Sequence, residues 1–225
     1  MIATARRAER LEQLQQEIGD ERRLRTVVGD IVDPEVRLRL YDAVAETGGR
    51  LDLLVNNAGV GAIGPFVSAQ PERLRRIMEV NFFAPVELSR IMFPMLCLGR
   101  AAVLCNVSSV LGHRAVPDKS EYCASKFALH GWSDSVRAEW KPYGVQVTLI
   151  SPSTTRSEFF DSVIGGENSV SSNTLGSWSP KRVARAILTT VIARRSEAIL
   201  SLGGKALVYA DRLTPPMVNL ILAKK

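Results

Sequence analysis

The sequence has no apolar segment long enough to cross a membrane. Its nearest candidate, residues 82–98, contains Glu87, Arg90 and two prolines, whereas a membrane helix needs about 20 predominantly apolar residues. No apolar run of signal-peptide length follows the charges near the N-terminus. We therefore predict a cytoplasmic protein without an integral membrane segment.

Cysteine and histidine are both scarce, with three and two residues respectively. Cys97, Cys105 and Cys123 lack any CxxC spacing and stand in apolar or helical contexts, so we expect packed thiols in a reducing compartment. His113 and His130 stand at no spacing typical of metal ligands. The sequence therefore predicts no metal site, and it assigns both histidines to packing or to the surface.

Positive charge is only mildly in excess, with a formal net charge of +6 at pH 7. Much of the excess comes from arginines beside helix-like sequence, namely Arg6, Arg7, Arg10, Arg22, Arg23 and Arg25. We interpret them as a solvated basic face and predict no nucleic-acid partner, since no nucleic-acid-binding motif accompanies the charge. The alternative, nucleic-acid binding through these arginines, would make retention on DNA steeply dependent on salt.

The sequence contains no internal repeat. Instead, short runs of β-branched residues alternate with amphipathic stretches. The 225 residues, 46% of them hydrophobic, can bury the core of one domain, residues 1–225. The alternation predicts an α/β fold, a doubly wound parallel sheet with helices on both faces. The expected strands are 1–5, 24–28, 51–55, 101–107, 145–150 and 198–202, and the expected helices are 8–18, 34–48, 70–98 with a bend near Pro85, 119–140 and 180–194.

A serine, a tyrosine and a lysine have a spacing that suits proton transfer to a carbonyl. Ser109 precedes Tyr122 by thirteen residues, and Lys126 follows Tyr122 by four. Four residues along a helix, Lys126 shares a face with Tyr122, and its charge would lower the phenol pKa from about 10. Ser109, leaving a strand, could orient a substrate oxygen. Taken singly, Tyr122 and Lys126 would be a packing pair and Ser109 a turn residue.

Further motifs in the same order overturn those plainer interpretations, because together they closely resemble the short-chain dehydrogenase/reductase family over nearly the whole chain. The motifs are Asp30, Asn56-Asn57-Ala58-Gly59, Asn81, Ser109, the run from Tyr122 to Lys126, and Ser151-Pro152. The resemblance implies a Rossmann-like fold and an oxidoreductase that transfers hydride between a nicotinamide cofactor and a carbonyl or secondary alcohol. It further implies that Lys126 binds the nicotinamide ribose, and that Asn81 holds a water on a proton relay. The alternative for Asn81 is a bond to nearby backbone.

The resemblance also implies a set of cofactor contacts. In the family, the segment containing Asn56, Ala58 and Gly59 lines the adenosine ribose and stabilises the sheet, so a tight βα turn is compatible with it. Asp30 corresponds to an aspartate that contacts adenine, although an acidic cap on the next helix would look much the same.

Pro152 and Thr155 belong to the family segment near the nicotinamide, where Thr155 corresponds to a threonine that contacts the carboxamide. Ser153 replaces the family's glycine there, and a left-handed backbone at serine would cost energy.

The cofactor predicted is NADP rather than NAD. Ala5 supplies no carboxylate after the first expected strand, whereas Arg6 and Arg7 can hold the additional phosphate of NADP. The alternative is that these are two more arginines at the start of a basic helix.

The start of the chain departs from the family pattern. The family's first strand, its TGxxxGxG turn and the following helix have no counterpart, although they supply most of the pyrophosphate contacts. Because that strand pairs with two neighbours, its absence predicts two unpaired edges within the sheet. We therefore interpret the chain as truncated relative to the family. An intact mass of 24.7 kDa for the native protein would contradict this.

Two further segments bear on substrate and partners. Residues 157–179 correspond to the substrate-covering segment, and their apolar side chains indicate an apolar or amphipathic substrate or simply pack the segment down. These are Phe159, Phe160, Val163, Ile164, Leu175 and Trp178. The apolar tail, residues 205–225, is expected to pack on the core; a subunit interface or weak peripheral membrane contact is the alternative. The resemblance implies a homodimer or homotetramer. The alternative function is a noncatalytic dinucleotide-sensing or scaffold protein with impaired cofactor binding.

Overall fold

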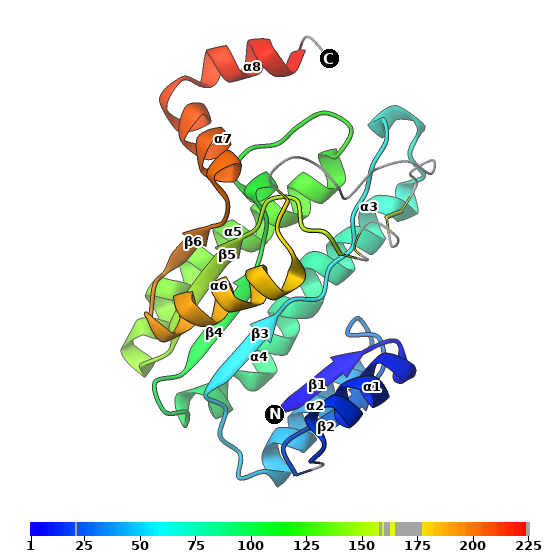
Figure 1. The fold of residues 1–225 in the computed structure, drawn as a ribbon, viewed down its shortest axis with the longest axis vertical. Helices are drawn as coiled ribbons and strands as arrows, with labels where there is room; N and C mark the ends of the chain where they lie inside the picture. The colour runs from blue at the N-terminus through cyan, green and yellow to red at the C-terminus, as the bar shows by residue number, and fades with distance from the viewer. Residues whose placement is uncertain (21, 158, 160–162, 165–176, 224–225) are drawn as a thin grey trace.

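The computed structural model describes residues 1–20, 22–157, 159, 163–164 and 177–223, and Figure 1 shows them as alternating strands and helices. The strands are β1 (Ile2–Ala5), β2 (Arg25–Val28), β3 (Leu53–Asn56), β4 (Val103–Val107), β5 (Gln146–Ser151) and β6 (Glu197–Ile199). The helices are α1 (Ala8–Ile18), α2 (Pro34–Glu46), α3 (Pro71–Met78), α4 (Ala84–Cys97), α5 (Ser120–Trp140), α6 (Pro180–Ile192), α7 (Leu202–Leu213) and α8 (Pro215–Ala223). The α/β alternation expected from the sequence is confirmed.

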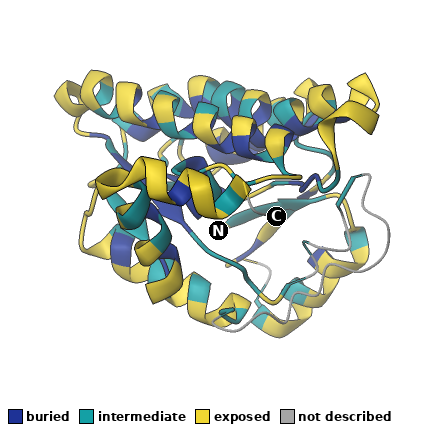
Figure 2. Cartoon of the chain, turned by 90° about the horizontal axis from the view of Figure 1, so that it is seen from above, coloured by how far each residue is buried: buried dark blue, intermediate teal, exposed yellow. Residues whose placement is uncertain are grey.

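The larger sheet has the order β3-β4-β5-β6, with every pair parallel. Successive side chains of a strand point to opposite faces, so β4 contacts a different helix with each face. Val103 and Cys105 pack in the cluster that includes α6, whereas Leu104 packs with Val136 of α5. Buried residues accordingly line the inner sides of the helices, and exposed residues face outward (Figure 2). The sheet is covered on both faces, as the doubly wound pattern requires.

A second sheet contains only β1 and β2, and within the described residues neither strand pairs with β3. This confirms the expected break in the sheet, because one edge of β1 and one edge of β3 are without a strand partner there. The two sheets are joined instead by α2, whose Val36, Leu40 and Val44 pack against Leu88 and Met92 of α4. In Figure 1 this N-terminal unit lies beside the larger sheet as a blue layer.

The long helix expected at residues 70–98 is present as α3 and α4, joined by a π-helical turn at Glu79–Phe83. The turn comes directly before Pro85, which has no backbone N–H to donate to the preceding turn. A π-turn accommodates such an interruption without breaking the helical path, and it is common at functional sites. It contains Asn81, which is almost fully buried.

The C-terminal tail shows the expected core packing only in part, because Val208 of α7 is buried but α8 is largely exposed. In α8 only Val218 is buried, while Met217, Leu220 and Ile221 are each more than half exposed. Figure 1 shows α8 extending away from the sheet. Over the part of the chain that the structure describes, no helix combines the length and the apolar character needed to span a membrane.

Candidate active site

Ser109, Tyr122 and Lys126 meet at the carboxyl end of β4. Ser109 follows that strand, and its hydroxyl accepts a hydrogen bond from the backbone N–H of Leu111 at 3.1 Å, which starts the 3-10 turn Val110–Gly112. Tyr122 and Lys126 lie one turn apart at the start of α5. The Ser109 hydroxyl is close enough to the Tyr122 phenol to lower its pKa. The arrangement expected from the spacing is therefore present.

The phenol of Tyr122 is half-buried in apolar surroundings. Its ring meets that of Phe159 edge-on, with the centroids 5.8 Å apart, and also packs against the cluster containing Val60 and Val80. Burial raises the pKa of Tyr122 to about 12, against a smaller lowering by the hydrogen bond with Ser109. This is the opposite of the lowered pKa expected from Lys126. The ammonium lies 5.8 Å from the ring centroid, and desolvation of the phenolate is the larger effect.

Lys126 is buried although it carries a charge. Only 4% of it is exposed, and burial lowers its pKa to about 8. Its Nζ donates to the carbonyl of Val107 at 3.0 Å, the one hydrogen bond it makes within the described residues. An ammonium has three donors, so two are available to other acceptors. A Cβ added to Gly59 would lie 3.6 Å from Nζ, so glycine keeps the space beside the ammonium open.

Asn81 is fixed by its neighbours. Its Oδ1 accepts from the N–H of Val60 at 2.8 Å, and its Nδ2 donates to the carbonyl of Val60 and to Ser125 Oγ, at 3.0 and 2.9 Å. The Ser125 hydroxyl in turn donates to the Tyr122 carbonyl. Asn81 does bond to backbone, but to Val60, 21 residues earlier, and not to the nearby backbone of its own helix. It ties the segment after β3 to α5, beside Lys126.

The segment after β3 divides into a structural part and an open part. The amide of Asn56 is buried and donates to Asn106 Oδ1 at 2.8 Å and to Ser89 Oγ at 2.9 Å. It therefore joins β3 to β4 and α4, which accounts for its predicted role in stabilising the sheet. Ala58 is exposed. A Cβ on Gly59 would come within 3.3 Å of Asn81 Oδ1, so the close approach predicted for a glycine is present here.

Asp30 lies at the carboxyl end of β2 and is paired with Arg76 of α3. Burial raises the pKa of Asp30. Hydrogen bonds from Arg76 and from the Val32 N–H, together with the charges of Arg76 and Arg6, lower that pKa by more than burial raises it. The net effect is a lowered pKa. Asp33, and not Asp30, caps α2, so the capping alternative for Asp30 is wrong. Arg76 was missed because nothing in the sequence relates it to Asp30, 46 residues away.

Arg6 and Arg7 are both exposed at the carboxyl end of β1, directly before α1. The charge of Arg6 acts on Asp30, which places the two residues near each other at the ends of β1 and β2. The predicted phosphate-binding arginines and the predicted adenine-contacting aspartate therefore share one edge of the small sheet.

The segment after β5 contains Pro152, Ser153 and Thr155. The Pro152 carbonyl accepts from the N–H of Val110 at 2.9 Å, which links this segment to the turn after Ser109. Thr155 donates to the Ser153 carbonyl at 3.3 Å and pairs with Trp178. Ser153 is not among the residues with positive φ. The expected cost of a left-handed serine is therefore absent.

Only part of the substrate-covering segment is described, and Phe160 and Leu175 lie outside the described residues. Phe159 and Val163 both reach within 3.1 Å of where a Cβ of Gly61 would stand, and the N–H of Ile164 donates to the Gly61 carbonyl at 3.0 Å. These three side chains close over the loop after β3, next to Tyr122. The expected apolar cover is therefore present where it is described.

A pocket of about 370 Å³ lies beside these residues. Its lining includes Arg73, Arg76 and Ile164, and does not include the hydroxyl, phenol and ammonium groups described above. Arg73 is buried and forms an ion pair of 2.7 Å with buried Glu121, the residue before Tyr122. The sequence contained no local signal for this pair, because its partners are 48 residues apart.

A parallel sheet with a hydroxyl, a phenol and an ammonium at the carboxyl ends of its strands defines a Rossmann-like, NAD(P)-binding oxidoreductase fold. Residues 1–167 match the family model described as short chain dehydrogenase. The chain belongs to the short-chain dehydrogenase/reductase family.

Similar proteins agree with this assignment. The chain is 29% identical, over 237 residues, to dehydrogenase/reductase SDR family member 7B of Xenopus laevis, covering 100% of this chain and 73% of that protein. A short-chain dehydrogenase from Streptomyces avermitilis is similar in structure, with a TM-score of 0.83 at 26% identity over 98% of this chain and 85% of that one. A short chain dehydrogenase from Burkholderia cenocepacia, solved in complex with NADP, has a TM-score of 0.79 at 24% identity over the same shares.

Proposed function

We propose that this protein is an NADP-linked oxidoreductase that interconverts a carbonyl and a secondary alcohol. The observation that carries the proposal is the Ser109 hydroxyl placed close enough to the Tyr122 phenol to lower its pKa, with buried Lys126 one helical turn away. A hydroxyl and a phenol placed in this way can both reach one substrate oxygen. Lys126 supplies the only positive charge among these three groups.

Each of the three residues has a separate task in the proposed reaction. The Tyr122 phenol gives a proton to the carbonyl oxygen as the substrate is reduced and takes it back in the reverse direction. The Ser109 hydroxyl donates to the same oxygen and stabilises the charge that develops there. After proton transfer, the positive charge of Lys126 stabilises the negative charge of the Tyr122 phenolate. The raised pKa of Tyr122 keeps the phenol protonated beforehand, as an acid in the reducing direction must be.

The proposed cofactor contacts are made by residues that follow the carboxyl ends of the strands. Bound NADP would supply or accept the hydride. The two donors of Lys126 that lack a partner among the described residues suit ribose hydroxyls, and the space beside Gly59 admits them. Thr155 would hold the carboxamide, and Asp30 the adenine. Arg6 and Arg7 would hold the additional phosphate, which favours NADP over NAD.

The remaining proposals concern the setting of the reaction. Phe159, Val163 and Ile164 form an apolar cover beside Tyr122, which favours an apolar or amphipathic substrate. We further propose that residues 1–225 act as one domain, in the cytoplasm, as a homodimer or homotetramer. The exposed apolar residues of α8 are available for a subunit contact or for weak contact with a membrane surface.

A tyrosine substitution tests the proposed chemistry. Tyr122→Phe removes the proton donor and should lower turnover of a reactive carbonyl with NADPH by at least about 100-fold, while NADPH affinity stays within a few-fold. Tyr143→Phe is the matched control, since Tyr143 is largely exposed and contacts Phe93 through its ring. Turnover and NADPH fluorescence titration are measured on both variants. Full turnover by Tyr122→Phe would refute the proposal.

A second candidate function is a noncatalytic dinucleotide-sensing or scaffold protein. The divided sheet favours it, because no described strand lies between β1 and β3, the position from which a strand followed by a helix would present backbone N–H groups to a pyrophosphate. NADPH fluorescence followed by a panel of carbonyl substrates distinguishes the two. Binding without oxidation of NADPH by any substrate favours the scaffold, whereas oxidation that Tyr122→Phe abolishes favours the enzyme.

A further inference from the structure

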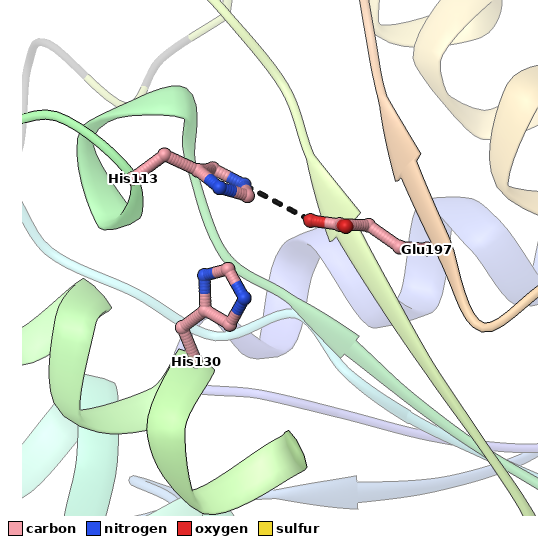
Figure 3. A group of neighbouring side chains, drawn as sticks. All are labelled: His113, His130 and Glu197. Carbon is pink, nitrogen blue, oxygen red and sulfur yellow. Dashed lines mark ion pairs between the residues drawn. The ribbon is translucent and has the colours of Figure 1, made fainter. Parts of the chain in front are cut away.

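Two histidines and a glutamate from separate elements converge beside the larger sheet (Figure 3). His113 stands in the turn after β4, His130 in the middle of α5, and Glu197 at the start of β6. One nitrogen from each ring and one carboxylate oxygen all lie within 4.8 Å of one another. Imidazole and carboxylate are ligands of zinc and similar first-row cations, whereas magnesium and calcium prefer oxygen alone.

The distances are close to those of a coordination shell. His113 Nε2 lies 3.1 Å from Glu197 Oε1, and the two rings are edge to face with their centroids 4.4 Å apart. Ligand bonds of about 2.0–2.1 Å in a tetrahedron place neighbouring donor atoms roughly 3.4 Å apart. His113 and Glu197 are already near this spacing. His113 Nε2 also lies 2.9 Å from Ser151 Oγ, a contact that a bound cation would replace.

Glu197 depends on His113 for a partner. Its Oε1 is inaccessible to solvent, and His113 Nε2 lies 3.1 Å from it. Hydrogen bonding to this ring lowers the pKa of Glu197. A carboxylate oxygen buried in this way is costly unless a proton or a cation neutralises it, and it points at the same space as the histidine nitrogens, as Figure 3 shows.

His130 has a support typical of metal-bound histidine. Its Nδ1 lies 3.3 Å from the carbonyl of Gly112. A carbonyl only accepts, so Nδ1 carries the proton of the neutral ring and Nε2 keeps its lone pair. Metal-binding histidines usually donate their second nitrogen to a carbonyl or a carboxylate. Nε2 also lies 3.4 Å from Asp134 Oδ2, a half-exposed carboxylate that is already paired with Arg137.

We propose that His113, His130 and Glu197 bind one divalent first-row cation of the zinc type. His113 stands four residues after Ser109, and His130 four residues after Lys126, on the helix that also carries Tyr122. The cation therefore joins β6 to the two segments that carry the proposed catalytic groups. It acts as a structural cross-link outside the cluster of Ser109, Tyr122 and Lys126.

One neighbouring charge opposes this cation. Arg212 of α7 donates to His113 Nδ1 at 3.4 Å, which in a neutral ring leaves the His113 proton on Nε2, facing Glu197. Metal binding at Nε2 displaces that proton and brings a second positive charge near the guanidinium. Arg212 therefore opposes binding of the cation.

Zinc binding to the full chain, without a histidine tag, tests the proposal. Isothermal titration with Zn²⁺ at pH 7.5 should give one site per chain. His113→Gln, His130→Gln and Glu197→Gln should each weaken binding at least tenfold, whereas Arg212→Gln should strengthen it several-fold. Cys97→Ser is the control for thiol binding, since Cys97 is the more exposed of the three thiols, and it should leave affinity unchanged.

Two results would overturn the proposal: no stoichiometric binding, or binding that the three ligand substitutions leave unchanged. His113 is deeply buried, so its variant is checked for folding by near-ultraviolet circular dichroism. If that variant does not fold, the other two decide, because His130 and Glu197 are partly exposed. The titration contains no nucleotide, so its outcome is independent of the proposed reductase activity.

Discussion

Lys126 carries its charge in a part of the protein that excludes water. Its folded pKa of about 8 lies below the ordinary value of 10.5, so between these values the unfolded chain binds more protons than the folded one. Stability contributed by this residue therefore rises with pH through that window, and the full cost of the buried ammonium is present at pH 7. At pH 7 the buried ammonium therefore reduces the stability of the fold.

Replacing this lysine should reveal that cost. Lys126→Met should be more stable than wild type at pH 7, and the difference should shrink as pH rises toward 9.5, by at most about 1.4 kcal/mol per pH unit. Urea unfolding at pH 7, 8 and 9.5 measures it, with exposed Lys205→Met as control. A difference that does not change with pH would show that Lys126 stays protonated throughout.

Arg6 gives a residue-level test of cofactor preference. Arg6→Asp removes the proposed phosphate partner and introduces a carboxylate that can accept hydrogen bonds from ribose hydroxyls. NADPH affinity should therefore fall about tenfold or more, while NADH affinity stays equal or rises. Fluorescence titration with both nucleotides measures the ratio. Arg185→Asp on α6 makes the same charge change away from β1. An equal loss for both nucleotides would contradict a phosphate role.

At the scale of elements, α3 and α5 are held together by a buried ion pair. Arg73 and Glu121 are 7% and 2% exposed, and Arg73 also donates to the Ile63 and Gly64 carbonyls. Because Glu121 begins the turn that carries Tyr122, this pair fixes the start of α5 beside the site.

Breaking this pair should be costly. Arg73→Met leaves a buried carboxylate unpaired and should lower the free energy of unfolding by about 3–5 kcal/mol. Arg90→Met breaks an exposed pair with Glu87 and should cost about 0.5 kcal/mol or less. Urea unfolding at pH 7 compares them. Arg73→Met with Glu121→Leu should recover much of the loss, and equal losses for the two single variants would contradict the buried-pair argument.

The elements themselves could be predicted from the sequence because their signals are local. The helical spacing of apolar residues in 8–18, followed by Gly19, predicted both ends of α1. Runs of β-branched residues predicted the ends of each strand to within a few residues. The π-turn before Pro85 could not be predicted, because the proline indicates only an interruption and tertiary packing decides its form.

The site was predictable to the extent that its residues are close in sequence. Tyr122 and Lys126 share a helix face by spacing alone, whereas the pKa of Tyr122 depends on a burial that no spacing reveals. His113, His130 and Glu197 are 17 and 67 residues apart. The absence of a local metal-ligand spacing therefore did not exclude their convergence in the fold.

At the scale of the whole molecule, the two sheets are linked by side-chain packing and not by strand pairing. β1 and β2 pair with each other, and α2 connects them to α4 through apolar contacts. Strand edges without partners lose the hydrogen bonds that would join the sheets into one cooperative unit. We expect residues 1–48 to open more readily than the larger sheet.

Amide hydrogen exchange followed by mass spectrometry tests this expectation. Peptides covering β1, β2 and α2 should exchange with a lower opening free energy than those covering β4 and β5, which pair on both sides in the larger sheet. Within that sheet, β3 should exchange faster than β4, because β3 has a partner on one side only among the described residues. Uniform protection across both sheets would show that packing of α2 on α4 alone makes the molecule a single cooperative unit.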